Sequence, residues 1–236
     1  MKRKLYILIL ILLSSNQINS QKKKEKKEIY PKFKFGINVG PNYTSLRGSF
    51  SPALDSENKY DSQFNSFGGL SIEYKIDKHR SIVVNLNLEN KSVKSNYLLY
   101  NDIFDTNPET IEDKIKFKYI NMPILFRCYF GGDNNLFING GIFLNNLIDL
   151  KNTLENNTTG EKYSTIDYNS FFDNNDIGLV LGIGSSFNLT SRNSLSIELR
   201  NDYGLEDINS LNYYYENYSS KTNSIKFILT WSFSSK

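Results

Sequence analysis

The chain has 236 residues, enough for one or two domains, and a single all-β domain can use this whole length. It carries 28 Lys and Arg against 25 Asp and Glu, but residues 1–20 hold three basic and no acidic residues, so the remainder is neutral and does not favour nucleic-acid binding. A single cysteine, Cys128, excludes an intramolecular disulfide, and a single histidine, His79, excludes a histidine-rich metal site.

The first thirty residues are typical of an export signal followed by a charged leader. Lys2, Arg3 and Lys4 precede an apolar run at residues 5–13, which is too short to cross a bilayer as a helix. A small, polar stretch ends at Ser20, which we predict to be the last residue before cleavage. We therefore expect a signal peptide at 1–20, a basic leader at 21–30 and a folded domain at 31–236. An uncleaved membrane anchor is the alternative for the first segment.

After Tyr30 the dominant pattern is an alternation of apolar and polar residues with period two, which predicts half-buried β-strands. Phe33, Phe35, Ile37 and Val39, for example, are separated by polar residues or glycine. No later segment has the roughly 18 consecutive apolar residues of a membrane helix. Eight segments show the alternation: 33–40, 69–76, 82–89, 115–130, 136–145, 177–184, 195–202 and 224–233.

The fourth segment changes phase along its length. Its apolar residues fall at odd positions from Ile115 to Tyr119 and at even positions from Met122 to Phe130. We predict a β-bulge at residues 120–121, because one extra residue would return all of these side chains to one face. Pro123 has no N–H for a ladder hydrogen bond and suits an irregularity at this place.

The connections between the segments predict the topology. Three are short, at residues 77–80, 131–135 and 189–193, and four are long and polar, at 44–66, 92–114, 149–175 and 206–223. Short and long connections alternate strictly, as in up-and-down membrane barrels with tight turns at one membrane face. The fold class predicted is therefore all-β: an eight-stranded, antiparallel, up-and-down transmembrane β-barrel at 31–236.

The apolar faces are expected to meet lipid, and the polar faces to meet across a narrow lumen. The export signal, glycines on the polar faces and aromatic residues at the strand ends, such as Trp231 and Phe233, favour this arrangement. Eight strands enclose space for side chains only. Charges inside must pair, so we predict a structural network in the lumen; a proton or ligand path is the alternative. Its predicted members are Glu73, Glu89, Arg127, Glu198, Arg200 and Lys226.

These segments resemble the PorT-like outer-membrane β-barrels of Bacteroidota over nearly all of the mature chain. The resemblance rests on residues 35–40, 119–126, 137–141, 176–184 and 203–205, and most of all on Tyr119 followed by Pro123. It implies an eight-stranded barrel in the cell outer membrane. Phe233, at the end of the last strand, resembles the signal by which the outer-membrane assembly machinery recognises its clients, so this machinery is an expected partner. One namesake takes part in a secretion system, so a secretion or envelope assembly complex is one expected partner. No catalytic residues belong to the family pattern.

Other motifs give weaker hypotheses. Gly182 and Gly184 lack the third glycine and the helix of a dinucleotide fingerprint, and His79 is expected to lie solvated in a periplasmic turn. Acidic residues at 102–113 are expected to be solvated, with calcium binding as the alternative. We therefore predict no enzyme, no cofactor, no metal and no catalytic residue. The expected function is structural, adhesive or partner-binding, through long extracellular loops; the alternatives are the assembly complex, a soluble lipocalin-like carrier and a membrane enzyme.

Overall fold

The structure is a computed structural model that describes residues 33–49, 60–100, 108–131, 135–163, 172–209 and 219–234. The predicted signal peptide and basic leader lie outside these residues. The described part is almost entirely β-strand, and none of its segments is a helix long and apolar enough to cross a bilayer.

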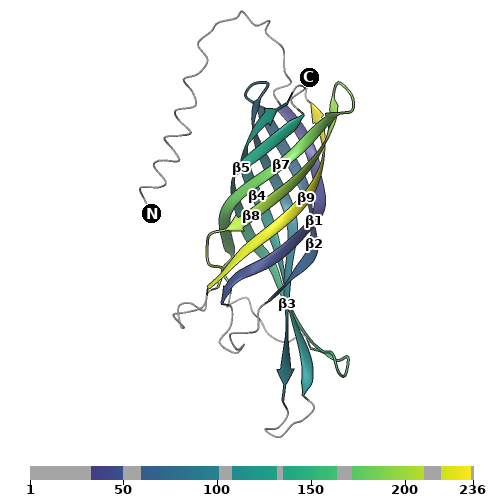
Figure 1. The fold of residues 1–236 in the computed structure, drawn as a ribbon, viewed down its shortest axis with the longest axis vertical. Helices are drawn as coiled ribbons and strands as arrows, with labels where there is room; N and C mark the ends of the chain where they lie inside the picture. Colours follow the sequence, from purple (N-terminus) through teal and green to yellow (C-terminus); the bar gives the residue numbers. More distant parts are fainter. Residues whose placement is uncertain are drawn as a thin grey trace, which may run out of the picture.

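Eight long strands and one short strand form a single sheet that closes on itself (Figure 1). Neighbouring strands are antiparallel, β1 pairs with β9, and the pairing of β4 with β5 closes the ring. The predicted eight-stranded up-and-down barrel is confirmed. The bounds are β1 Phe33–Ser49, β2 Asp61–Lys75, β3 Arg80–Leu99, β4 Glu109–Phe130, β5 Leu136–Asn156, β6 Lys162–Tyr163, β7 Asn175–Asn188, β8 Asn193–Gly204 and β9 Ser219–Ser234.

The two ends of the barrel differ. The short connections between β2 and β3, β4 and β5, and β7 and β8 lie at one end, at the top of Figure 1. The long connections lie at the other end, where β3 and β4 continue as a projecting hairpin (Figure 1). Membrane barrels keep short turns in the periplasm and long loops outside the cell, which defines the periplasmic and extracellular ends.

Apolar side chains point outward over the membrane-spanning part of every long strand. Ile37, Ile72 and Leu229 are 50%, 46% and 39% exposed, whereas the inward-pointing Asn38 and Asn87 are 1% and 2% exposed. On β1 the apolar outward positions extend from Phe33 to Tyr43, which matches the roughly 9–11 residues that a tilted strand needs to cross the hydrocarbon core. This arrangement is the reverse of a soluble carrier, whose apolar side chains fill its centre.

Aromatic residues gather at the periplasmic rim of the outer surface. The rings of Phe33 and Tyr74 lie 5.1 Å apart, and those of Trp231 and Phe233 also lie 5.1 Å apart. All four side chains are 38–49% exposed on the outward face. The amphipathic rings of tyrosine and tryptophan prefer the boundary between hydrocarbon and headgroups, and aromatic girdles flank the apolar band of membrane barrels, so this rim marks the periplasmic membrane interface.

The prediction of a β-bulge within β4 is wrong. β4 keeps a constant register with β3, from the pair Arg80 and Cys128 to the pair Leu99 and Glu109. Ile115, Phe117 and Tyr119 therefore point inward, where they are at most 3% exposed. The even-numbered residues from Ile120 to Phe130 point outward. The apolar phase changes because the medium outside the strand changes. Hydrocarbon surrounds β4 on the periplasmic side of Ile120, and water surrounds it on the extracellular side.

The bulge at this height lies in the neighbouring strand. Lys118 of β4 pairs with Asp149 of β5, while the next residue, Tyr119, pairs with Leu147. Ile148 is thus the extra residue. After it, the even-numbered side chains of β5 point inward, whereas before it the odd-numbered ones do. The sequence of β4 alone could not assign it, because a bulge is a property of the paired strands.

Candidate functional site

Among the described residues, eleven charged side chains are at most 7% exposed. One of them, Asp113, lies in the extracellular part of β4, and the signs of the ten inside the membrane-spanning barrel balance. The five basic residues are Lys34, Lys91, Arg127, Arg200 and Lys226, and the five acidic residues are Glu73, Glu89, Asp176, Glu198 and Asp202. Because taking an ion out of water costs several kcal/mol, these charges require close partners.

The periplasmic half of the lumen is organised around Arg127 on β4. Its Nη1 lies 3.6 Å from Glu73 Oε2 on β2, and its Nη2 lies 3.3 Å from Glu198 Oε2 on β8. Arg200 Nε lies 2.6 Å from Glu198 Oε1, and the Tyr129 hydroxyl donates a 2.7 Å hydrogen bond to Glu73. Three strands are therefore joined across the barrel by one guanidinium group.

Glycines on β7 make room for this cluster. A Cβ atom on Gly182 would stand 2.5 Å from Glu198 Oε1. A Cβ atom on Gly184 would clash with the ring of Phe137, over which the Arg127 guanidinium stacks at 3.9 Å. The two glycines therefore serve close packing inside a narrow barrel, and the weak likeness to a nucleotide-binding loop has this structural explanation.

A chain of polar side chains crosses the middle of the barrel. Asn38 on β1, Asn87 on β3, Asn121 on β4 and Asn145 on β5 are linked in series by amide-to-amide hydrogen bonds of 3.4, 3.1 and 2.6 Å. Asn145 then donates to Asp176 on β7 at 2.9 Å. An amide both donates and accepts, so it can continue such a series where an ion would need a counter-charge.

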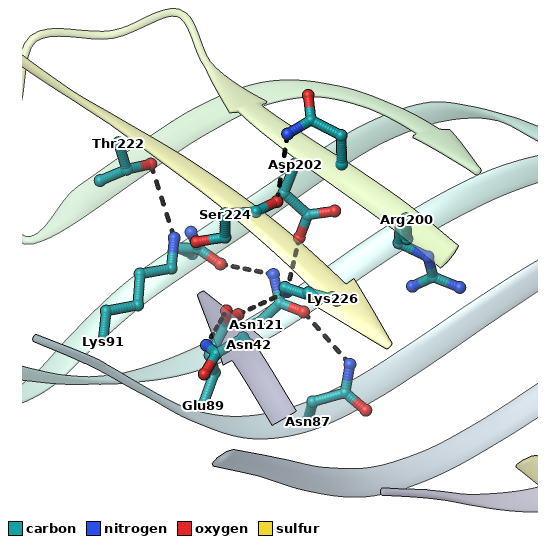
Figure 2. Close-up of polar contacts among 12 residues, drawn as sticks. Asn42, Asn87, Glu89, Lys91, Asn121, Arg200, Asp202, Thr222, Ser224 and Lys226 are labelled. Carbon is teal, nitrogen blue, oxygen red and sulfur yellow. Dashed lines mark hydrogen bonds and ion pairs between the residues drawn. The ribbon is translucent and has the colours of Figure 1, made fainter. Parts of the chain in front are cut away.

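A second charged cluster lies on the extracellular side of this chain. Figure 2 shows the Lys226 amine between two carboxylates, at 2.7 Å from Glu89 and 2.6 Å from Asp202. Asn42 donates a 2.9 Å hydrogen bond to Glu89. The strands involved are β3, β8 and β9, with β1 supplying the amide, so this cluster also spans the lumen.

Lys91 and Asp176 form a further buried pair next to this cluster. The Lys91 amine lies 3.4 Å from Asp176 Oδ2. It also lies 3.5 Å from the Thr222 hydroxyl (Figure 2). Thr222 itself donates to the same carboxylate at 2.7 Å. Lys91 also lies over the ring of Tyr119 at 5.2 Å, where the polar filling of the lumen meets apolar residues.

An apolar cluster closes the extracellular end. Its buried members, at most 3% exposed, are Val93, Ile115, Phe117, Tyr119, Phe172 and Ile208. Phe172 and Ile208 come from the connections outside the long strands, so chain from the loops folds over the mouth. Nearby, outside the membrane, burial raises the pKa of the Asp113 carboxyl, and a 3.3 Å hydrogen bond from Tyr60 partly offsets this effect.

The structure places the six residues of the predicted network in two groups. Glu73, Arg127, Glu198 and Arg200 are together in the periplasmic half, and Glu89 and Lys226 are together in the extracellular half. Sequence reasoning missed Asp202, Lys91, Asp176 and the asparagine series as members. The alternation already put Asp202 and Lys91 on polar faces, but it carries no information about which side chains meet.

Two further residues singled out in the sequence, His79 and Cys128, lie outside the lumen. His79 lies exposed in the periplasmic turn between β2 and β3, and Cys128 lies on the outward face of β4. No group of three or more metal-ligating His, Cys, Asp or Glu side chains occurs within the described ranges. Of the acidic residues at 102–113, Asp102 and Asp105 lie outside the described residues.

The chain is similar to a protein family and to several solved structures. The sequence matches the family "Outer membrane protein beta-barrel domain" over residues 19–210, and no curated protein matches it. Among solved structures it is similar to OprG from Pseudomonas aeruginosa, with 13% identity over 86% of this chain and 96% of that one and a TM-score of 0.49. Outer membrane protein W of E. coli gives 10% identity over 88% and 100%, with a TM-score of 0.46.

The family match covers most of the chain, and it includes all strands from β1 to β8. It agrees with the outward apolar belt and the charged interior described above. The chain therefore belongs to the outer membrane protein beta-barrel domain family and is a β-barrel protein of the cell outer membrane.

Proposed function

We propose that this protein is a closed, non-catalytic barrel whose function is carried by its extracellular part, in adhesion or partner binding. The observation that carries the proposal is the filled lumen: ten buried charges of balanced sign lie inside eight strands. Eight-stranded barrels have interiors only wide enough for side chains, so a diffusion pore has no room. The apolar cluster around Phe117 and Phe172 adds a closure at the mouth.

The projecting part of the sheet supports a role outside the membrane. β3 and β4 stay paired as far as Leu99 and Glu109, well beyond the apolar belt that ends at Ile120 on β4. Near the tip of this hairpin, Leu98, Leu99 and Tyr100 are 52%, 44% and 58% exposed. Apolar side chains displayed on a rigid scaffold, away from lipid, are typical of contact surfaces.

The same features weigh against an enzyme. A nucleophile needs a base within hydrogen-bond reach, and the single histidine of the chain, His79, lies exposed in a periplasmic turn. The buried carboxylates Glu73, Glu89 and Glu198 are all engaged by cations within the lumen. Their arrangement suits mutual neutralisation, which is the structural role proposed for the network.

The narrower resemblance to PorT-like barrels supports the alternative, a component of a secretion or envelope assembly complex. The motif that carries this resemblance, Tyr119 and Pro123, faces the interior of the barrel. It therefore supports a shared way of packing β4 more directly than a shared partner. The aromatic end of β9, Phe233, is consistent with recognition by the outer-membrane assembly machinery during biogenesis.

Two measurements test the proposal. The refolded barrel should give no conductance steps in a planar bilayer, and regular steps would contradict a closed lumen. In cells, L98S/L99S/Y100S should reduce attachment or partner capture several-fold, while L86S, on the lipid-facing side of β3, should leave surface binding unchanged at equal surface level. Unchanged attachment together with stable co-purification of envelope machinery would favour the assembly complex.

A further inference from the structure

A row of lysines lies on the outer wall of the barrel, immediately on the extracellular side of the apolar belt. On β4 the outward positions change from Ile120 to Lys118, then Lys116, then Lys114. Successive outward positions are separated by about 6.6 Å along a strand. The lysine row therefore begins where the hydrocarbon ends, at the height of the outer-leaflet headgroups.

The neighbouring strands enlarge this row into a patch. Lys116 pairs directly with Lys151 of β5, and Lys114 pairs with Lys94 of β3. Like charges directly opposite each other on one face destabilise a sheet. Two such pairs lie side by side, and an anion bound between them would relieve this repulsion.

The local carboxylates do not neutralise the patch. Lys94 lies 3.2 Å from Glu112, and Lys151 lies 3.6 Å from Asp149. Within the described part of the chain, Lys114, Lys116 and Lys118 form no ion pair. Asp61 of β2 also pairs directly with Lys94. Five lysines thus face three carboxylates, which leaves a net charge of two on a small area of the outer wall.

The patch also lines a hollow of about 450 Å³. Its charged lining is Lys91, Lys116, Lys118, Lys151 and one carboxylate, Asp149, and its polar lining is Asn65, Ser66 and Asn90. The hollow lies where the ladder between β2 and β3 is interrupted, between Ser62 and Phe67. Its amide and hydroxyl groups offer hydrogen bonds next to the cationic groups, which suits a phosphorylated sugar.

We propose that this patch binds the phosphorylated glycolipid headgroup of an outer-leaflet lipid, of the lipid A type. Leu88 and Ile120, the next outward side chains toward the periplasm, are 53% and 38% exposed and would contact the acyl chains of the same lipid molecule. The lysine patch matches the phosphorylated headgroup of such a lipid, and the neighbouring apolar belt matches its acyl chains. Basic clusters at a membrane surface attract anionic headgroups in this way.

The test uses the refolded full chain in a neutral detergent, with bound lipid counted by native mass spectrometry. Parent protein should bind bis-phosphorylated lipid A at least tenfold more tightly than dephosphorylated lipid A. K116Q/K118Q should weaken binding by about 25-fold, because each lysine near a headgroup contributes about fivefold. K116R/K118R should bind like the parent, since the charge is kept. K78Q/R192Q, which removes two charges from the periplasmic turns, should also bind like the parent.

The controls separate this proposal from its competitors. Equal binding of the phosphorylated and dephosphorylated lipids, or of K116Q/K118Q and the parent, would overturn it. Inorganic phosphate at the same concentrations should not displace the lipid; displacement would assign the patch to a soluble anion. Heat-modifiability on a gel shows that each variant is folded before binding is compared.

Discussion

Arg127 shows how one side chain can hold a barrel together from the inside. It contacts Glu73 on β2, Glu198 on β8 and Asn139 on β5, and it stacks on Phe137. Glu198 keeps Arg200 as a second partner, whereas Glu73 has no other cation within ion-pair distance in the described residues. Loss of Arg127 would therefore leave Glu73 without an ion-pair partner, with only the more distant charge of Lys34 nearby.

We predict that R127A lowers the free energy of unfolding by about 3–5 kcal/mol, the range for breaking a buried ion pair from one side. Urea unfolding in lipid vesicles, followed by the heat-modifiable gel shift, measures this value. R192A, in the exposed turn between β7 and β8, is the matched control and should stay within about 0.5 kcal/mol of the parent. An R127A barrel as stable as the parent would show that the ion pairs contribute nothing.

At the residue scale, the sequence predicts which face a charge occupies but not which charge it meets. Glu89 and Lys226 are 137 positions apart and meet at 2.7 Å. That contact depends on the tilt and stagger of all eight strands, which alternation does not encode. The same limit explains why Asp202, the second partner of Lys226, was on a predicted polar face and yet absent from the predicted network.

At the scale of the strand, β4 shows one chain segment built for two media. Over residues 120–130 it follows the rule of a membrane barrel, with apolar side chains outward. Over residues 111–119 it follows the rule of a water-soluble sheet, with Ile115 and Phe117 buried and Lys116 and Lys118 exposed. The sequence contained this change of phase, but a bulge was the wrong interpretation because it assumed one medium along the whole strand.

A series of substitutions on β4 separates the two interpretations. I124K, in the lipid belt, should cost about 2–4 kcal/mol of unfolding free energy. F117K, in the apolar cluster, should cost at least about 3 kcal/mol, since it removes a buried ring and buries a charge. K116L, exposed above the belt, should stay within about 0.5 kcal/mol. Urea unfolding in vesicles compares all three, and a K116L cost equal to that of I124K would contradict the assigned boundary.

At the scale of the whole molecule, the barrel inverts the usual arrangement of a water-soluble protein, with apolar side chains outside and charged side chains inside. The outer surface is apolar where lipid covers it, and the charges inside sum to zero, so neither surface exposes an uncompensated ion to a poor solvent. Topology was predictable because short and long connections alternate in the sequence. The projecting part of β3 and β4 was not, because residues 92–114 were interpreted as a polar loop although they pair from Ser92 to Leu99.

The single cysteine gives a direct test of which medium covers the outer wall. Cys128 is an outward, exposed residue of β4, between Phe126 and Phe130, so the protein itself does not shield its thiol. Only lipid can exclude water there. In nanodiscs, where both membrane faces are open to solvent, we predict that a charged, water-soluble maleimide labels Cys128 at least a hundredfold more slowly than the same barrel unfolded in urea.

The matched control moves the thiol into water without changing the barrel wall. C128S/S191C places it in the exposed periplasmic turn between β7 and β8, where labelling should be as fast in nanodiscs as in urea. An apolar maleimide that partitions into the bilayer should label Cys128 and restore the rate. If the charged reagent reacted with Cys128 as fast as with the turn cysteine, water and not lipid would cover the apolar outer face, and the assignment of a membrane-spanning belt to β4 would be wrong.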